Sequence, residues 1–141
     1  MTKDVIISIS GIHSQDGEDS DVEFVTTGNH YIKNGAHYFL YDEIMEEVPE
    51  AVKNTVKNKD GGMEIMKRGG TAVHMVFRQG QTVNSRYVTP YGEMTVGITT
   101  DKIGVEEEED RICVKVEYFL DVNYEHVSRC SLVLEARSKA V

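Results

Sequence analysis

Two histidines that flank a predicted turn are the first residues of this sequence whose chemistry could serve a site. His30 and His37 lie on either side of Asn34-Gly35, a strong signal for a two-residue β-hairpin because both turn residues tolerate positive φ. In that hairpin the two imidazoles share one face, diagonal to each other. They could hold a metal ion if a third ligand arrived from elsewhere. Nothing nearby in the sequence supplies one, so we expect stacked surface or semi-buried histidines and no metal site.

Basic and aromatic side chains alternate through residues 63–94 and suggest a ligand site. An inward guanidinium could fix an anionic group beside an apolar wall, whereas an outward one would be an ordinary solvated charge, the commoner case for any single arginine. Arg68 is the strongest inward candidate because it ends a predicted strand. We place the apolar wall at four aromatic or methionine residues, of which the flexible thioethers adapt well to ligands: Met75, Phe77, Tyr87 and Met94. The other basic candidates of this region are His74, Arg78 and Arg86.

Catalytic signatures are absent from the sequence. It contains no hydrolase elbow, phosphate-binding glycine loop or paired-carboxylate motif, and turns explain the glycines at 61–62, 69–70 and 80. We therefore predict no catalytic residues and no cofactor. An enzyme with an unrecognised site stays an alternative that the sequence does not exclude.

Composition restricts the class of protein. The chain has 141 residues, 40% hydrophobic content and a net charge of −9, which disfavours nucleic acid and anionic membranes as partners. No apolar run approaches the roughly 20 residues that span a bilayer, and no secretory signal is visible. We predict one cytoplasmic domain over residues 1–141. The acidic runs at 16–21 and 106–110 are interpreted as solvated loops rather than cation sites.

Turn signals place the strands that must position these side chains. Pro90 presets φ in a tight turn that Gly92 closes, and similar turns are predicted at Asn34-Gly35 and Asp60-Gly61. The three hairpins predict these cross-strand pairs: Tyr31–Tyr38, His30–Phe39, Val56–Ile65, Lys57–Glu64, Tyr87–Met94 and Ser85–Val96.

Two local assignments have alternatives. Apolar residues recur every four positions over 44–56, as in a helix, but the turn at 60–61 favours a strand over 51–59 after a connector at 44–50 that could hold one helical turn. At Gly80, a two-residue turn would set Val76 opposite Val83, and a three-residue turn would set Phe77 there. We favour the second because it buries Met75 and Phe77.

The C-terminal strands alternate most clearly. Ile112, Val114, Val116, Tyr118 and Leu120 share one face, and Cys130, Leu132, Leu134 and Ala136 match it. A turn at 122–125 would set Val116 opposite Cys130 and Cys113 opposite Val133. The two cysteines would then lie on opposite faces, out of disulfide reach, and both should be free thiols.

Together these segments predict nine or ten short-linked strands without a long helix. An open sheet of that size leaves two edges, and a sandwich needs longer crossovers than the chain offers. We therefore predict an all-β fold, a closed antiparallel up-and-down barrel like that of the lipocalins.

Four motifs, taken in order, resemble the YwiB-like family of small bacterial proteins. They lie at 34–43, 66–70, 75–77 and 87–92, and include Met66-Lys67-Arg68-Gly69-Gly70 and Thr89-Pro90-Tyr91-Gly92. The resemblance covers nearly the whole chain and implies a calycin-like β-barrel in a domain of unknown function. It implies no activity, but the Arg-Gly-Gly segment adds weight to Arg68.

Three hypotheses for function follow. The first is a non-enzymatic barrel that binds a small amphipathic or anionic ligand through the wall residues, with Arg68 near the mouth. The second is an interaction module, in which the wall residues fill a solid barrel and a protein partner or a second copy of the chain binds an aromatic surface at Tyr31, Tyr38 and Tyr41. The third, an enzyme, is least supported. The sequence identifies neither the ligand nor the pathway nor the oligomeric state.

Overall fold

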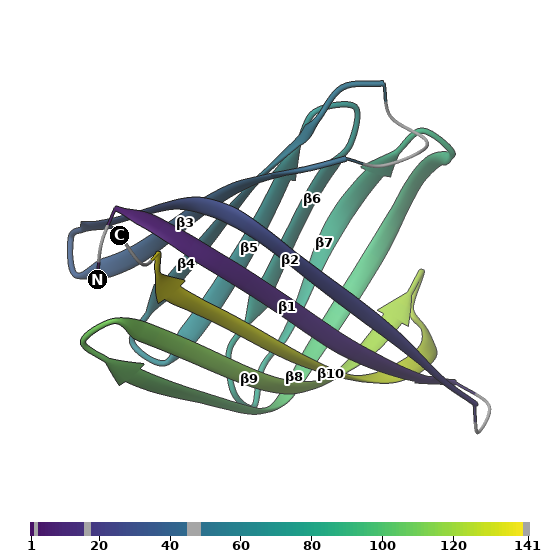
Figure 1. Ribbon diagram of the computed structural model, residues 1–141. Coiled ribbons are helices and arrows are strands. Elements are labelled where there is room, and N and C mark those ends of the chain that lie inside the picture. Colours follow the sequence, from purple (N-terminus) through teal and green to yellow (C-terminus); the bar gives the residue numbers. More distant parts are fainter. Residues whose placement is uncertain (2, 16–17, 45–48, 140–141) are drawn as a thin grey trace.

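A computed structural model describes residues 1, 3–15, 18–44 and 49–139, and within them every regular element is a strand. Figure 1 shows ten strands wound around one interior. No helix in these ranges is long and apolar enough to cross a membrane. The strands are β1 Asp4–Gln15, β2 Glu18–Lys33, β3 Ala36–Glu43, β4 Val52–Lys59, β5 Gly62–Arg68, β6 Ala72–Phe77, β7 Thr82–Thr89, β8 Gly92–Glu108, β9 Arg111–Val122 and β10 Glu125–Ser138.

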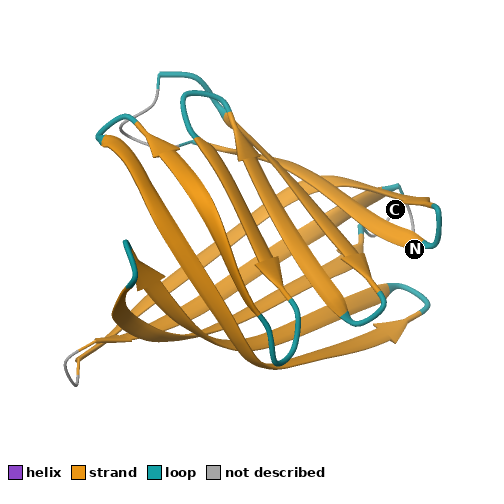
Figure 2. Ribbon diagram, turned by 180° about the vertical axis from the view of Figure 1, so that it is seen from behind, coloured by secondary structure: helices purple, strands orange, loops and turns teal. Residues whose placement is uncertain are grey.

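The sheet closes on itself, as predicted. Each strand pairs antiparallel with the next in sequence, and β1 pairs with β10 to complete the barrel. Figure 2 shows the same meander from behind, with short turns at both ends. Closure gives each strand a partner on both sides over at least part of its length, which reduces the exposed edges that could template aggregation.

The predicted hairpins have the predicted registers. Asn34 and Gly35, like Asp60 and Gly61, have positive φ, as type I′ turns require. All six predicted cross-strand pairs occur. Strand β4 begins at Val52, which confirms the strand over 51–59 and excludes a helix from there on; part of the connector, residues 45–48, lies outside the described residues.

The turn at Gly80 buries the larger apolar set. Ala72 pairs with Val88, the register in which Phe77 would lie opposite Val83. Phe77 is fully buried, and Met75 packs against the core. The prediction of a three-residue turn is confirmed.

The acidic runs were predicted to be loops, but strand β2 begins at Glu18 and β8 continues to Glu108, so only 109–110 of the second run form a turn. Residues 16–17 of the first run lie outside the described residues. A β-bulge between Thr100 and Lys102 realigns β8 so that Ile103 faces Val116 and Val105 faces Val114. These apolar pairs hold the strand on the barrel although its outward side is acidic.

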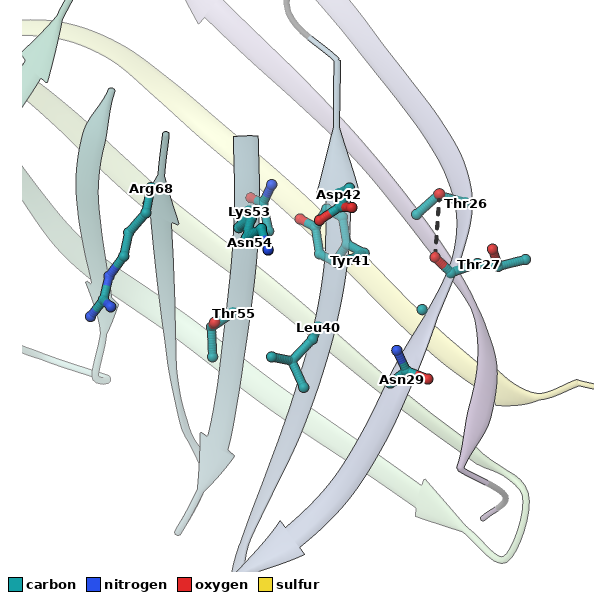
Figure 3. A pocket seen from close by; sticks show the side chains of 11 residues that line it. Thr26, Thr27, Asn29, Leu40, Tyr41, Asp42, Lys53, Asn54, Thr55 and Arg68 are labelled. Atoms are coloured by element: carbon teal, nitrogen blue, oxygen red, sulfur yellow. Dashed lines mark hydrogen bonds between the residues drawn. The ribbon is translucent and has the colours of Figure 1, made fainter. Parts of the chain in front are cut away.

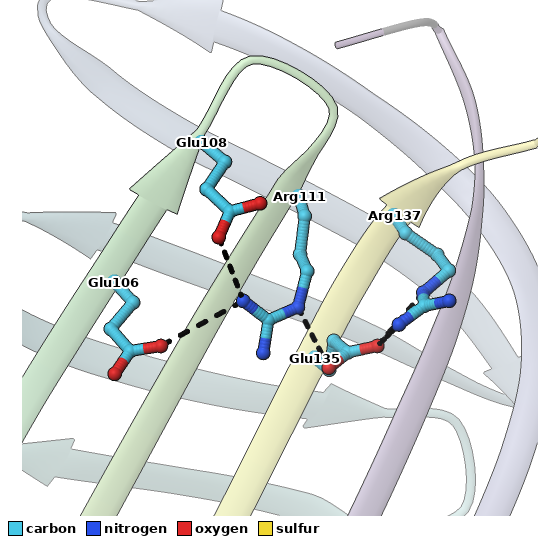
Figure 4. A network of polar contacts seen from close by, with 5 residues as sticks. All are labelled: Glu106, Glu108, Arg111, Glu135 and Arg137. Carbon is cyan, nitrogen blue, oxygen red and sulfur yellow. Dashed lines mark hydrogen bonds and ion pairs between the residues drawn. The ribbon is translucent and has the colours of Figure 1, made fainter.

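A neighbouring strand partly offsets the charge of the second acidic run (Figure 4). Arg111 lies within 3.7 Å of Glu106, 3.5 Å of Glu108 and 3.0 Å of Glu135. Arg137 Nε also donates to Glu135, at 2.8 Å. Burial alone would raise the pKa of Glu135, but the hydrogen bonds from the two arginines outweigh it and lower that pKa. The network joins β8, β9 and β10.

The register predicted for the last hairpin is wrong by two residues. Val116 faces Leu132, Cys130 faces Tyr118 and Cys113 faces Glu135. The turn is tighter than predicted, with positive φ at Asn123 and Tyr124, and a bulge follows between His126 and Ser128. The prediction for the thiols holds, because both cysteines are buried and neither forms a disulfide in the described part of the chain.

Candidate functional site

The four predicted wall residues all face the barrel interior. Phe77 is completely buried at the centre of the core, whereas Met75, Tyr87 and Met94 pack against the core and are partly exposed. These three are nearer the barrel end that carries the turns at 69–70 and 90–91. The interior is therefore filled around Phe77 and less completely covered towards that end.

Arg68 does not face the interior, contrary to our prediction. Met63 and Ile65 belong to the core, so the alternation of β5 turns Arg68 outward, where it is exposed. The inward cation is its neighbour Lys67, whose Nζ lies 2.6 Å from Glu43 Oε1.

Lys67 belongs to a row of inward side chains at one level of the barrel. Cross-strand pairing sets Tyr41 beside Asn54, Asn54 beside Lys67 and Lys67 beside Val73. Because Ala72 pairs with Val88, the same register sets Val73 opposite Tyr87, and Tyr87 pairs in turn with Met94. We call this row the belt; it consists of Tyr41, Asn54, Lys67, Val73, Tyr87 and Met94, from β3 to β8.

Two polar atoms of the belt are buried without a partner in the described part of the chain. Asn54 is 1% exposed, and its Nδ2 donates to Glu43 Oε1 and to the Val52 carbonyl, both at 3.3 Å. Since both contacts are acceptors, they fix the orientation of the amide. Asn54 Oδ1 and the Tyr87 hydroxyl then have no hydrogen bond. Native proteins pair almost all such buried atoms with protein, water or ligand.

Strands β2 and β3 separate beside Tyr41, at one end of the belt, and we call this gap in the barrel wall the fork. Strands β2 and β3 pair only over Asn29–Lys33 and Ala36–Leu40; further along, β2 pairs with β1 and β3 with β4. Gly28 lies where they part, and a Cβ there would be 2.4 Å from the Leu40 carbonyl oxygen. The close approach of the two backbones at this point therefore needs glycine.

The fork holds a hollow of about 530 Å³ (Figure 3). Its lining includes residues from both faces of the wall: the inward Tyr41 and Asn54 of the belt, and the outward Lys53 and Arg68, which are cross-strand neighbours. Figure 3 shows Tyr41 and Thr26 on the two strands of the fork and Arg68 on the far side of the hollow. The remaining lining residues are Thr27, Gly28, Asn29, Leu40, Asp42 and Thr55.

The groups of the belt whose pKa is shifted are two tyrosines, of which Tyr41 lines the hollow. Burial raises the pKa of Tyr87, and burial together with the charge of Glu43 raises that of Tyr41. Both hydroxyls therefore stay neutral across the physiological range. They can donate or accept a hydrogen bond but are not tuned to exchange protons near neutral pH.

The histidine pair has a partner that the sequence did not reveal. His30 Nε2 lies 2.9 Å from His37 Nδ1, and His37 Nε2 lies 2.9 Å from Glu107 Oε1. The two rings stack with centroids 5.2 Å apart. Because both nitrogens of His37 are engaged, this chain of hydrogen bonds serves to join the β2–β3 and β8–β9 hairpins.

Comparison with known proteins identifies the family. The sequence profile of a domain of unknown function, DUF1934, matches residues 7–134. The chain belongs to this family. It is 25% identical over 138 residues to the uncharacterised β-barrel protein YwiB of Bacillus subtilis strain 168, covering 96% of both chains. The crystal structure of that protein superposes with a TM-score of 0.86 at 22% identity, over 98% of this chain and 93% of the other. The predicted resemblance is confirmed, and the shared feature is the barrel.

Sequence reasoning missed Tyr41, Glu43, Asn54 and Lys67 as members of one site. The signal was present, because the predicted pairing of Val56 with Ile65 also sets Asn54 opposite Lys67. Apolar alternation drew attention to the methionines instead, and polar residues facing a barrel interior do not stand out in such a pattern.

Replacing Tyr87 with phenylalanine tests the unpaired hydroxyl. The change removes a buried polar atom that has no partner, so we expect the free energy of unfolding to rise by about 1 kcal/mol. Urea denaturation at equilibrium would measure it. Tyr91→Phe is the matched control, since Tyr91 is exposed at the β7–β8 turn and should change nothing. A loss of stability in Tyr87→Phe would show that the hydroxyl is paired.

Proposed function

We propose that this protein binds a small amphipathic molecule, without catalysis, in the hollow between β2 and β3 and against the belt. The observation that carries the proposal is the buried Asn54, which lines this hollow and has an unpaired acceptor. A volume of about 530 Å³ lies within the usual range for sites of small ligands. The calycin-like character implied by the family resemblance supports the proposal, because lipocalin barrels of similar size hold one small ligand.

Apolar surface for such a ligand lies beside the polar atoms. Phe24 faces the interior from β2 and contacts the Tyr41 ring, with centroids 5.8 Å apart. Met94, which pairs with Tyr87 at the other end of the belt, also packs against the core and is partly exposed. Burying these side chains under a hydrocarbon chain would contribute roughly 25 cal/mol per Å² of apolar area.

A change that fills the hollow tests the proposal. Thr55 lines it from the outward face of β4, so Thr55→Trp should occupy the space without disturbing the core. We expect calorimetric titration of the wild type with octyl compounds, 1-octanol among them, to give saturable binding. Thr55→Trp should weaken that binding by at least about tenfold, or 1.4 kcal/mol.

The control is Thr82→Trp, on the exposed face of β7 and away from the fork. It should bind like the wild type. The proposal fails if no octyl compound binds the wild type, or if the two tryptophan variants bind equally well.

A cytoplasmic location is part of the proposal. Its support is that Cys113 and Cys130 are buried and form no disulfide in the described part of the chain, which suits a reducing compartment.

A second candidate is self-association through the outer face of β2 and β3. Tyr31 and Tyr38 stack there with ring centroids 4.9 Å apart, Tyr31 and Val25 are exposed, and Lys57 lies over the Tyr38 ring. Tyr41, predicted for this surface, is instead buried at 6% exposure. Sedimentation equilibrium would favour this candidate if the wild type dimerises and Tyr38→Ser is monomeric.

A further inference from the structure

We infer that the head group of the ligand is uncharged and carries a hydrogen-bond donor, as an alcohol or a primary amide does. The inference rests on the proposed function and narrows its ligand class, which the sequence left as amphipathic or anionic.

The charges at the belt argue for an uncharged head. Lys67 is the belt's cation, and Glu43 lies 2.6 Å from it, with both side chains about one quarter exposed at 23% and 26%. The pair is already neutral overall. An anionic head beside Lys67 would meet the carboxylate of Glu43, and a cationic head beside Glu43 would meet Lys67. Either ion would lose hydration without gaining an uncompensated partner.

The unpaired atoms argue for a donor. Asn54 Oδ1 can only accept a hydrogen bond, and it is buried without a partner among the described residues. A carboxylate head brings only acceptors and would leave this oxygen unpaired. A hydroxyl or an amide N–H would satisfy it. The Tyr87 hydroxyl is also unpaired, but it does not line the hollow, so Asn54 alone indicates the donor.

Two outward cations could instead favour an anionic head group. Lys53 and Arg68 lie side by side on the outer rim of the hollow, and there they could attract a carboxylate. Both are exposed to water, where a single contact of this kind contributes little to binding. The buried Asn54 oxygen therefore should decide the preference, because leaving a buried acceptor unpaired costs more.

Four ligands of matched length test the inference on the wild-type protein at pH 7.5. We expect calorimetric titration to show that 1-octanol and octanamide bind at least about tenfold more tightly than octanoate. The fourth ligand, 1-methoxyheptane, has the heavy-atom count of octanol but no donor, and it should also bind at least about tenfold more weakly than octanol.

A variant tests whether Asn54 causes the preference for a head group with a donor. Asn54→Leu keeps the approximate size of the side chain and removes the acceptor, so octanol and 1-methoxyheptane should bind it equally. If this variant does not fold, the comparison of the two ligands on the wild type still decides the matter. Thr55→Trp, which leaves Asn54 intact, should weaken all four ligands together.

The outcomes distinguish failure of this inference from failure of the proposed function. Tighter binding of octanoate than of octanol, or equal binding of octanol and its ether to the wild type, would overturn the inference and leave the proposed function standing. Binding of none of the four would overturn both, and would indicate that ordered water satisfies Asn54.

Discussion

Replacing Phe77 with alanine is expected to lower the free energy of unfolding by about 4 kcal/mol, the range found for large aromatic deletions in tightly packed cores. Phe77 is 0% exposed. Its ring meets that of Tyr118 edge-on, with centroids 5.0 Å apart and planes at 71°, a geometry that adds to the loss of buried area. Strands β6 and β9 are three places apart in the barrel, so this contact packs together parts of the wall that do not pair. Equilibrium urea denaturation followed by circular dichroism would measure the change.

Tyr91 provides the control for Phe77. It is 83% exposed at the β7–β8 turn, so Tyr91→Ala should change the free energy of unfolding by less than about 0.5 kcal/mol. Similar losses in the two variants would contradict the packed interior around Phe77.

Gly28→Ala is expected to destabilise the barrel by about 3 kcal/mol, at the upper end of the cost of overpacking. The added Cβ would lie 2.4 Å from the Leu40 carbonyl oxygen and 2.7 Å from Ile7 Cδ1. The isoleucine can rotate, but the carbonyl belongs to the backbone next to the last pair of the β2–β3 ladder. Relief therefore requires β3 to move away from β2, which would widen the fork. Thermal and urea denaturation would both report the loss.

Gly104→Ala is the matched substitution for Gly28→Ala. Gly104 is in the outward face of β8, and a Cβ there would meet nothing within 4 Å. Alanine at this position should be neutral or should stabilise the protein by up to about 1 kcal/mol, because it restricts the unfolded chain. If the two glycine variants unfolded at the same urea concentration, the close approach at Gly28 would be wrong.

The sequence by itself determined most of the barrel, because its information is local. Two-residue turns such as Asn34-Gly35 have one preferred backbone geometry, and that geometry sets the register of the strands it joins. Strict alternation in β9 then assigned each side chain to a face, and the absence of long connections required a meander. The same reasoning, carried two residues further along β4 and β5, would have placed Asn54 and Lys67 inside and Arg68 outside.

Only the tertiary structure decided the features that depend on distant strands. The bulges after Thr100 and after His126 each insert one residue, and nothing in the local sequence requires them. They form because closing the barrel demands a fixed stagger between strands, which the bulges supply. The fork between β2 and β3 arises in the same way: β2 follows β1 while β3 follows β4, and the competing pairings separate them. The hollow and the unpaired Asn54 oxygen beside it are products of that separation, so no pattern within a single strand could predict them.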